Sequence, residues 1–173
     1  EQVTALTKAF GVAILLIYAI LGSLFRSFAM PLVVMLAVPF SFIGVVVGFF
    51  VMGEPLGLMA VIGIIGLAGI VVNNSLILVD FINSGRAAGL PRREATLRAC
   101  RLRLRPILLT SITTIFGLLP LAIGLFGVSA FLSPIAVAIV WGLTFATFLT
   151  LLLVPGLYAI VDDIAGRTGR TRF

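Results

Sequence analysis

Five long apolar stretches run through this chain of 173 residues and constrain its fold more than any other feature. Each holds about 20 or more predominantly apolar residues, the length that an α-helix needs to cross a hydrocarbon core of about 30 Å. Charged residues make up only 10% of the chain, whereas soluble domains carry about 25%. The sequence therefore predicts an all-α integral membrane protein, a bundle of five transmembrane helices over about 8–25, 31–52, 57–82, 105–127 and 131–161.

The distribution of basic residues predicts how this bundle is oriented. Seven of the twelve Lys and Arg residues lie between residues 86 and 105, and three more lie in the tail after residue 166. With five crossings, these arginines and Arg26 share one side of the membrane, and Lys8 lies on the other. The positive-inside rule assigns the Arg-rich side to the cytoplasm, so we expect an external N-terminus and a cytoplasmic C-terminus. The basic charge then reflects a lipid membrane, and we expect no nucleic-acid partner.

A short basic segment, about residues 91–103, precedes the fourth apolar stretch. Pro91 suits the first turn of a helix, and Leu97, Cys100 and Leu104 share one helical face. This pattern predicts one short cytoplasmic interfacial helix. A basic connector that meets anionic lipid explains the same residues equally well.

The segment before Lys8 does not resemble a signal peptide, which would have a positively charged start and a small-residue cleavage site. An external N-terminus without such a signal implies that other residues precede it. We therefore expect the chain to be the C-terminal portion of a longer polypeptide, and the odd number of helices favours the same interpretation.

A polar stripe is the main anomaly in the third apolar stretch. In GIVVNNSLILVDF, residues 69–81, a rotation of about 100° per residue places Asn73 and Asp80 on one narrow face with Gly66 and Gly69, while Asn74 and Ser75 point elsewhere. Small residues allow a neighbouring helix to approach closely, and polar groups at this depth need hydrogen-bond partners. The stripe is expected to face protein or a wet cavity.

Two interpretations of these polar residues remain open. Asn73 and Asn74 serve either as interhelical hydrogen-bonding groups or as part of a functional site, and Asp80 lies either at the membrane interface or within the bilayer. A carboxylate at mid-depth costs about 2.5–3.5 kcal/mol on insertion scales. Such residues usually mark ion or proton pathways.

The fourth apolar stretch supplies a counterpart to this stripe. Arg103 stands at its start, and Thr110 is followed by three further hydroxyl residues, Ser111, Thr113 and Thr114. Such hydroxyls commonly bond back to carbonyls of their own helix. A cation at the entrance, hydroxyls inside and carboxamides on a neighbouring helix also resemble parts of a proton or ion relay.

The residues that common enzymes and metal sites require are missing. The chain has no His and one Cys, so an intrachain disulfide cannot form, and a zinc site or a metalloprotease motif loses its main support. The G-x-S-x-G element of serine hydrolases is also absent. We therefore expect neither an enzyme nor a metal site.

The polar segments resemble those of a known family, the resistance-nodulation-division (RND) transporters. GIVVNNSLILVDF, followed by EATLRACRLRLRPILLTSITTIFGLLPLAIG, is similar to their tenth and eleventh transmembrane helices and the segment between them. ILGSLFRSFAMPLVVMLAVPFSFIGVVVG is similar to the eighth and ninth helices. The most specific string is RLRPILLTS, residues 103–111.

This resemblance implies a proton-driven exporter of the bacterial inner membrane, with no cofactor beyond the proton gradient. Family members have twelve helices in two repeated halves, of which this chain would supply helices eight to twelve. Its implied partners are the N-terminal half of the same transporter, two further copies in a homotrimer, a periplasmic adaptor and an outer-membrane channel. The transported substrate, whether drug, metal or lipid, is left open.

The resemblance also implies that Asn73, Asn74, Arg103 and Thr110 belong to a proton relay that responds to an aspartate pair in the other half, and we include Asp80 in this relay because it is a carboxylate within an apolar stretch. Asn73 stands where well-studied drug exporters have a lysine. A carboxamide stays neutral, so charge compensation and proton stoichiometry are not carried over. The alternative to an exporter is a non-transporting scaffold, lipid-sensing or protein-translocation accessory bundle of related build.

Overall fold

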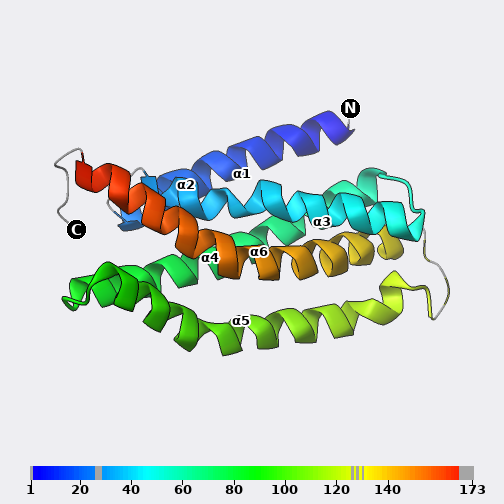
Figure 1. Ribbon diagram of the computed structural model, residues 1–173. Helices are drawn as coiled ribbons and strands as arrows, with labels where there is room; N and C mark the ends of the chain where they lie inside the picture. The colour runs from blue at the N-terminus through cyan, green and yellow to red at the C-terminus, as the bar shows by residue number, and fades with distance from the viewer. Residues whose placement is uncertain (1, 26–28, 126, 128, 130, 168–173) are drawn as a thin grey trace.

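The computed structural model describes residues 2–25, 29–125, 127, 129 and 131–167, and the described residues fold into a bundle of long helices (Figure 1). Five helical spans are long and apolar enough to cross a membrane, as the hydropathy pattern predicts. The helices are α1 (Gln2–Phe25), α2 (Ala29–Met35), α3 (Ala37–Met52), α4 (Leu58–Ala87), α5 (Arg92–Ala122) and α6 (Leu132–Arg167).

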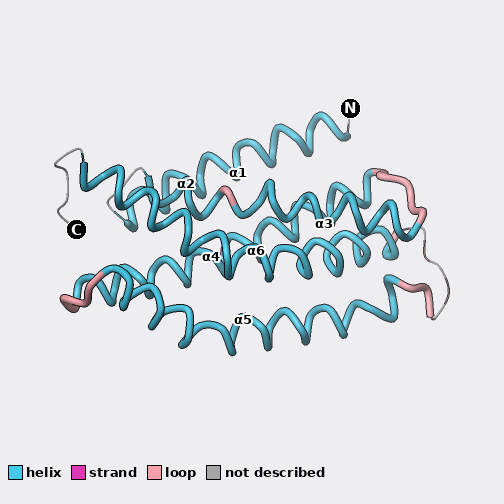
Figure 2. The backbone as a smooth tube through the Cα atoms, viewed as in Figure 1, coloured by secondary structure: helices cyan, strands magenta, loops and turns pink. Residues whose placement is uncertain are grey.

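The second span consists of α2 and α3, which meet at Leu36 (Figure 2). Pro39 explains this local break, because proline has no N–H to donate to the carbonyl four residues earlier, that of Met35. The break is small, since the Leu36 N–H still donates to the Leu32 carbonyl over 3.0 Å. Residues Met30–Met52 therefore act as one membrane span.

Residues 91–103 do not form a separate interfacial helix. Among the described residues, Arg92–Ala122 is one continuous helix, so the expected boundary before residue 105 is absent. Pro106 lies inside α5 and removes one backbone hydrogen bond, which permits a bend without ending the helix. Figure 1 shows the first turns of α5 at an angle to the rest, so the basic segment keeps its own direction as part of a longer helix.

The other helices also extend beyond their expected ends. The third span continues past residue 82 to Ala87, and the last begins at Leu132 and continues to Arg167. Hydropathy marks where lipid contact ends, whereas a helix continues into water as long as its backbone bonds are satisfied. The fourth span ends earlier than expected, at Ala122 rather than 127.

Helix α6 occupies the centre of the bundle, packed against α3, α4 and α5, whereas α1 lies at the edge and packs mainly against α2 (Figure 1). Large apolar side chains cover the outside, as in Phe50, Leu15 and Leu152, which are 88%, 69% and 77% exposed. In a soluble protein such a surface would be an aggregation hazard. Such a surface suits helices that cross a membrane or pack against further apolar helices.

The α4 and α6 helices pack along one seam with a constant register. A Cβ added to Gly63 would lie 2.8 Å from the Ala138 Cβ, and Asn83 accepts a hydrogen bond from Tyr158. Both pairs are separated by 75 positions, so the two helices run parallel. Repeating the register every four residues pairs Ser75 with Thr150, and both are buried. The seam is apolar except at that level and at its Asn83–Tyr158 end.

The α3 and α6 helices approach each other closely at two glycines of α3. A Cβ at Gly44 or Gly48 would overlap the side chains of Phe145 and Trp141 respectively. Glycines four residues apart lie on one helical face and let a neighbouring backbone come near, which is a common packing device in membranes. Gly44 and Gly48 therefore lie in the helix–helix contact between α3 and α6.

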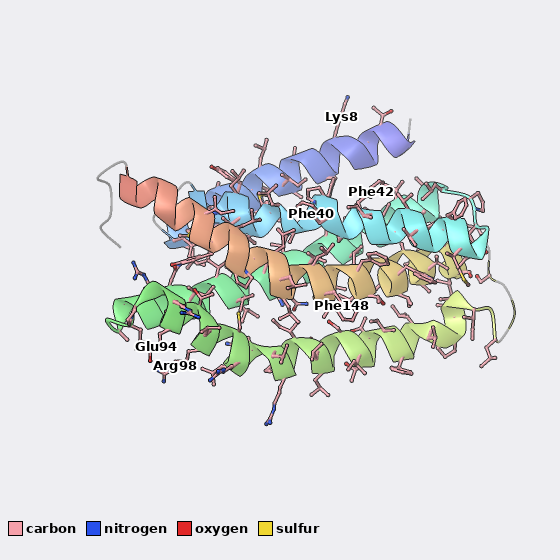
Figure 3. The ribbon with its side chains drawn as sticks, in the orientation of Figure 1. Lys8, Phe40, Phe42, Glu94, Arg98 and Phe148 are labelled. Carbon is pink, nitrogen blue, oxygen red and sulfur yellow. The ribbon has the colours of Figure 1, made fainter. Side chains whose placement is uncertain are left out.

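The two ends of the bundle differ in charge. The connection between α4 and α5 lies at the same end as the C-terminal end of α6, and the N-terminus lies at the opposite end (Figure 1). Figure 3 shows Glu94 and Arg98 at the first of these ends, whereas Lys8 projects from α1 nearer the other. Arg26, Arg170 and Arg172, which also support the predicted orientation, lie outside the described residues.

Candidate functional site

The α4 and α5 helices meet at Arg103, the basic residue that begins the RLRPILLTS string. The Cζ of its guanidinium lies 3.6 Å from the centre of the Phe81 ring, which is a close cation–π contact. The Nε atom is buried and has no hydrogen-bond partner among the described residues. The guanidinium is therefore held by an aromatic face, and its charge is not matched by a carboxylate of the described chain.

The same contact fixes the level of Asn74 and Thr110. Two α-helical turns take about seven residues, and a step of seven returns to nearly the same face. On α4, Asn74 lies seven residues before Phe81, and on α5, Thr110 lies seven residues after Arg103. Because the two helices are antiparallel neighbours, both steps run in the same direction along the bundle. These two predicted relay residues therefore lie at one level on adjacent helices. Asn74 is half-buried, and Thr110 is exposed.

The hydroxyls of α5 divide between two uses. Thr110 Oγ1 donates to carbonyls of its own helix, 3.0 Å from Ile107 O and 3.1 Å from Pro106 O. Thr113 and Thr114 also bond back to their helix. Hydroxyls within helices commonly bond to carbonyls of their own helix in this way. Ser111 differs, because its hydroxyl lies 2.8 Å from Thr147 Oγ1 of α6.

The Ser111–Thr147 pair forms part of a buried polar layer. Thr147 Oγ1 also lies 2.7 Å from the Leu143 carbonyl. A hydroxyl has one proton to donate, so donation by Thr147 to Leu143 leaves Ser111 to donate to Thr147. Thr150 lies one turn further along α6, and Ser75 faces it from α4. The Ser75 Oγ is buried without a hydrogen-bond partner among the described residues.

The residues of the predicted stripe on α4 are exposed. Asn73 and Asp80 are both exposed, as are Gly66 and Gly69, whereas Ser75 is buried. A Cβ at either glycine would meet no described residue within 4 Å. The expectation that these four residues share one face is confirmed. The expected close packing at Gly66 and Gly69 does not occur within the described chain; Gly69 instead borders an apolar pocket that residues of α1 and of the α2–α3 span also line.

The structure therefore brings some predicted site residues together and leaves others apart. Arg103 contacts Phe81 of α4, and Asn74 is half-buried two turns before Phe81, whereas Thr110, Asn73 and Asp80 are exposed. Sequence reasoning missed Phe81, although it follows Asn74 by seven residues and so shares its face. It also missed the Asn83–Tyr158 hydrogen bond of 2.8 Å, which hydropathy does not indicate.

The acidic and sulfur-containing groups do not gather into a metal site. Among the described residues, no three His, Cys, Asp or Glu side chains lie close enough to hold a metal ion. The α4 and α5 helices instead offer the Arg103 guanidinium, the amides of Asn73 and Asn74, the hydroxyls of α5 and the exposed carboxylate of Asp80. Such groups bind and orient charged or hydrogen-bonding partners.

Comparison with known proteins identifies close relatives of this arrangement. The model of the AcrB/AcrD/AcrF family matches residues 2–162. The chain is 41% identical over 162 residues to the swarming motility protein SwrC of Bacillus subtilis, covering 93% of this chain and 15% of that protein. It is 35% identical over 159 residues to the multidrug resistance protein MdtC of Salmonella schwarzengrund, covering 91% and 16%.

A solved structure shares the helix arrangement. The crystal structure of a heavy metal efflux pump, crystal form II, superposes with a TM-score of 0.80 and 31% sequence identity, over 88% of this chain and 15% of the pump. The chain thus spans about one sixth of the length of the proteins that it matches. With its five membrane-spanning helices and these matches, the chain belongs to the AcrB/AcrD/AcrF family of RND transporters.

Proposed function

We propose that this chain is the C-terminal membrane part of a proton-driven RND exporter, a substrate/proton antiporter, and that it supplies the α4 and α5 side of the proton relay. The observation that carries this proposal is the exposed polar stripe on α4. Its small and polar residues, Gly66, Gly69, Asn73 and Asp80, are exposed within a membrane span. Lipid is a poor partner for such a face.

A second half of the transporter is the partner that suits this face best. Small residues permit close approach of another helix, and amides need hydrogen-bonding groups that lipid lacks. RND relatives are about six times as long as this chain, which spans 15% of SwrC. We infer that a helix of the remaining length packs along the stripe and presents acidic groups to it.

The charges of the chain support a proton relay in which the facing half supplies the titrating acids and this chain supplies a cation. Proton coupling needs a group that binds a proton from one side and releases it to the other. In the sequence, Asp80 is the one acidic residue inside the predicted spans that carry the site, and a single carboxylate near one end is a poor two-sided switch. Arg103 brings a positive charge without a carboxylate partner among the described residues. The titrating acids would therefore come from the facing half, and Arg103 would respond to their charge.

Each relay residue has a distinct chemical role in this proposal. Arg103 stabilises the ionised state of a facing carboxylate, because an opposite charge nearby favours the charged form. Asn73 and Asn74 donate and accept hydrogen bonds without changing charge. Thr110 lies at the same height in the bundle as Asn74. In this proposal its hydroxyl exchanges the hydrogen bond to the Ile107 carbonyl for a hydrogen bond to another relay side chain. Asp80 lies on the exposed stripe with Asn73, at the Arg-rich end.

The cellular setting follows from the same proposal. The chain is placed in the bacterial inner membrane with the Arg-rich end in the cytoplasm. The complete protein is proposed to form a homotrimer that meets a periplasmic adaptor and an outer-membrane channel. Its relatives carry names that refer to multidrug resistance, swarming motility and heavy metal efflux, so their names do not select one substrate. The proton gradient is the proposed energy source, without a cofactor.

Export by the complete transporter tests this proposal. Arg103→Ala and Thr110→Ala are expected to lower the export rate about 5- to 150-fold, the range of a typical coupling free energy, with normal abundance in the membrane. Matched controls are Arg101→Ala and Leu109→Ala, both at exposed positions of α5, which are expected to export normally. Normal export by both relay variants would refute the proposed relay. A complete protein that moves no substrate would favour a scaffold, lipid-sensing or translocation-accessory role.

A further inference from the structure

The contact between Arg103 and Phe81 places a permanent charge against a neutral ring. The 3.6 Å separation of Cζ from the ring centre puts the cation directly over the aromatic face. Both side chains are partly buried, and the ring comes from α4 while the cation comes from α5. The contact therefore ties two helices together through a charge.

Arg103 carries a permanent charge at the edge of the apolar layer, where a charge without a partner costs free energy. Twenty residues span the hydrocarbon core, and a stretch of that length that ends at Ala122, the last residue of α5, begins at Arg103. Arg103 thus stands at the edge of the apolar layer, whereas Arg101 and Arg105 beside it are exposed. Arginine is always charged in proteins, so its side chain cannot adapt by losing the proton. The aromatic quadrupole is what the described chain supplies to it.

An aromatic partner has a consequence that a carboxylate would not have. A bidentate Asp or Glu would neutralise the guanidinium and occupy its N–H groups. A ring binds the flat face of the guanidinium and leaves the N–H edge without acceptors, as the unpartnered Nε of Arg103 illustrates. The stacked side chain is ordered in position but unsatisfied in hydrogen bonding, which prepares it to receive an acidic group.

We infer that Phe81 is a positioning residue for the relay, holding the Arg103 guanidinium flat on its ring so that the N–H edge faces an acidic partner. This inference rests on the proposed function, because it assigns the way in which one relay cation is kept ready. Phe81 acts through Arg103 and itself exchanges no proton. Its specific requirement is an aromatic face, which distinguishes it from an apolar packing residue.

Substitution of Phe81 in the complete transporter separates these two roles. Phe81→Leu keeps an apolar side chain but removes the quadrupole, whereas Phe81→Tyr and Phe81→Trp keep an aromatic face. Phe116→Leu is the matched control, since Phe116 lies on α5 and is 66% exposed. The maximal export rate and the half-saturating substrate concentration are measured for each variant at equal membrane abundance, alongside Arg103→Ala.

The expected result is a graded rescue. Phe81→Leu lowers the maximal rate about 2- to 30-fold, the factor that corresponds to loss of a cation–π contact, and leaves the half-saturating concentration unchanged. Phe81→Tyr or Phe81→Trp retains most of the rate, and Phe116→Leu is normal. A Phe81→Leu variant at the wild-type rate, or aromatic variants as slow as Phe81→Leu, overturns the inference. If Arg103→Ala and Thr110→Ala both export normally, the proposed function fails; if Arg103→Ala is slow while Phe81→Leu exports at the wild-type rate, the positioning role alone fails.

Discussion

The phenolic O–H of Tyr158 on α6 donates a hydrogen bond of 2.8 Å to the side-chain oxygen of Asn83 on α4. Tyr158 is buried, with 2% of its surface exposed, and it belongs to the core cluster that joins α1, α2, α4, α5 and α6. The bond closes the Arg-rich end of the α4–α6 seam. It sets the register of the two parallel helices at one end, as Gly63 and Ala138 do near the other.

Loss of this bond is expected to weaken the seam modestly. Tyr158→Phe keeps the buried ring and removes the donor, so the free energy of unfolding should fall by about 0.6–1.7 kcal/mol, as for other hydrogen bonds between membrane helices. Thermal unfolding of the purified transporter in detergent measures the change. A double-mutant cycle with Asn83→Ala gives the coupling energy. Fully additive single effects would show that the two side chains do not stabilise each other.

The glycines of α3 and α4 are expected to respond oppositely to added methyl groups. Gly48→Ala should destabilise the bundle by about 1–3 kcal/mol, because its Cβ would overlap Trp141 in a packed core. In this chain alone, Gly66→Ala should be neutral or stabilising, since its Cβ meets no described residue and alanine favours helix. Unfolding in detergent gives both values. Equal destabilisation by the two changes would show that the α4 stripe is already covered.

The same Gly66→Ala change carries a second prediction in the complete transporter. If another helix packs on the stripe, a methyl group there should lower the stability of the complete protein or its export rate, although it leaves this chain unaffected. Comparison of the two preparations isolates the contact. A change that is harmless in both would leave the stripe without a packing partner and contradict that part of the proposal.

Ser75 and Ser111 are both buried, but only Ser111 has a hydrogen-bond partner among the described residues. Ser75→Ala removes a buried oxygen without a hydrogen-bond partner among the described residues, so stability should stay constant or rise by up to about 1 kcal/mol. Ser111→Ala breaks the 2.8 Å contact with Thr147 and should cost about 0.6 kcal/mol. Chemical or thermal unfolding distinguishes them. A larger loss from Ser75→Ala than from Ser111→Ala would place an unseen partner at Ser75.

The sidedness of the bundle is tested by cysteine labelling. In a Cys100→Ser background, single cysteines at Glu54 and Leu90 occupy opposite ends of α4, near its start and just past its end. The charge asymmetry predicts that an impermeant reagent labels position 54 in intact cells and reaches position 90 only after the membrane is opened. Labelling of position 90 in sealed cells would reverse the proposed topology.

Hydropathy predicted the spans well because lipid leaves the backbone few alternatives to a helix. It placed the Arg92–Ala122 helix poorly, because a basic amphipathic segment and the start of a long helix have the same pattern until tertiary contacts are known. Helical periodicity also predicted that Asn73 and Asp80 share a face, and both are exposed. Periodicity depends on backbone geometry alone, so it holds wherever the helix is continuous.

Other features of the site could not be read from the sequence. Gly44 and Gly48 pack against α6 while Gly66 and Gly69 do not, yet both pairs lie in apolar helices, so spacing alone does not tell which face meets a neighbour. Phe81 is one of 14 phenylalanines, and its contact with Arg103 depends on how two antiparallel helices align. Such pairings follow from packing of the whole bundle.

In the proposed function, this chain responds to proton binding in a facing half and does not drive transport alone. Substrate flux in proteoliposomes under an imposed pH gradient, measured with the gradient present and collapsed, tests it directly. The chain alone should insert as a helical bundle and move no substrate, since Asp80 is its one carboxylate in the site and repeat-built transporters move one half against the other. The complete transporter should show gradient-dependent flux that Arg103→Ala greatly reduces. Gradient-dependent flux by the chain alone, lost in Asp80→Asn, would show that this chain couples proton movement to transport without a facing half.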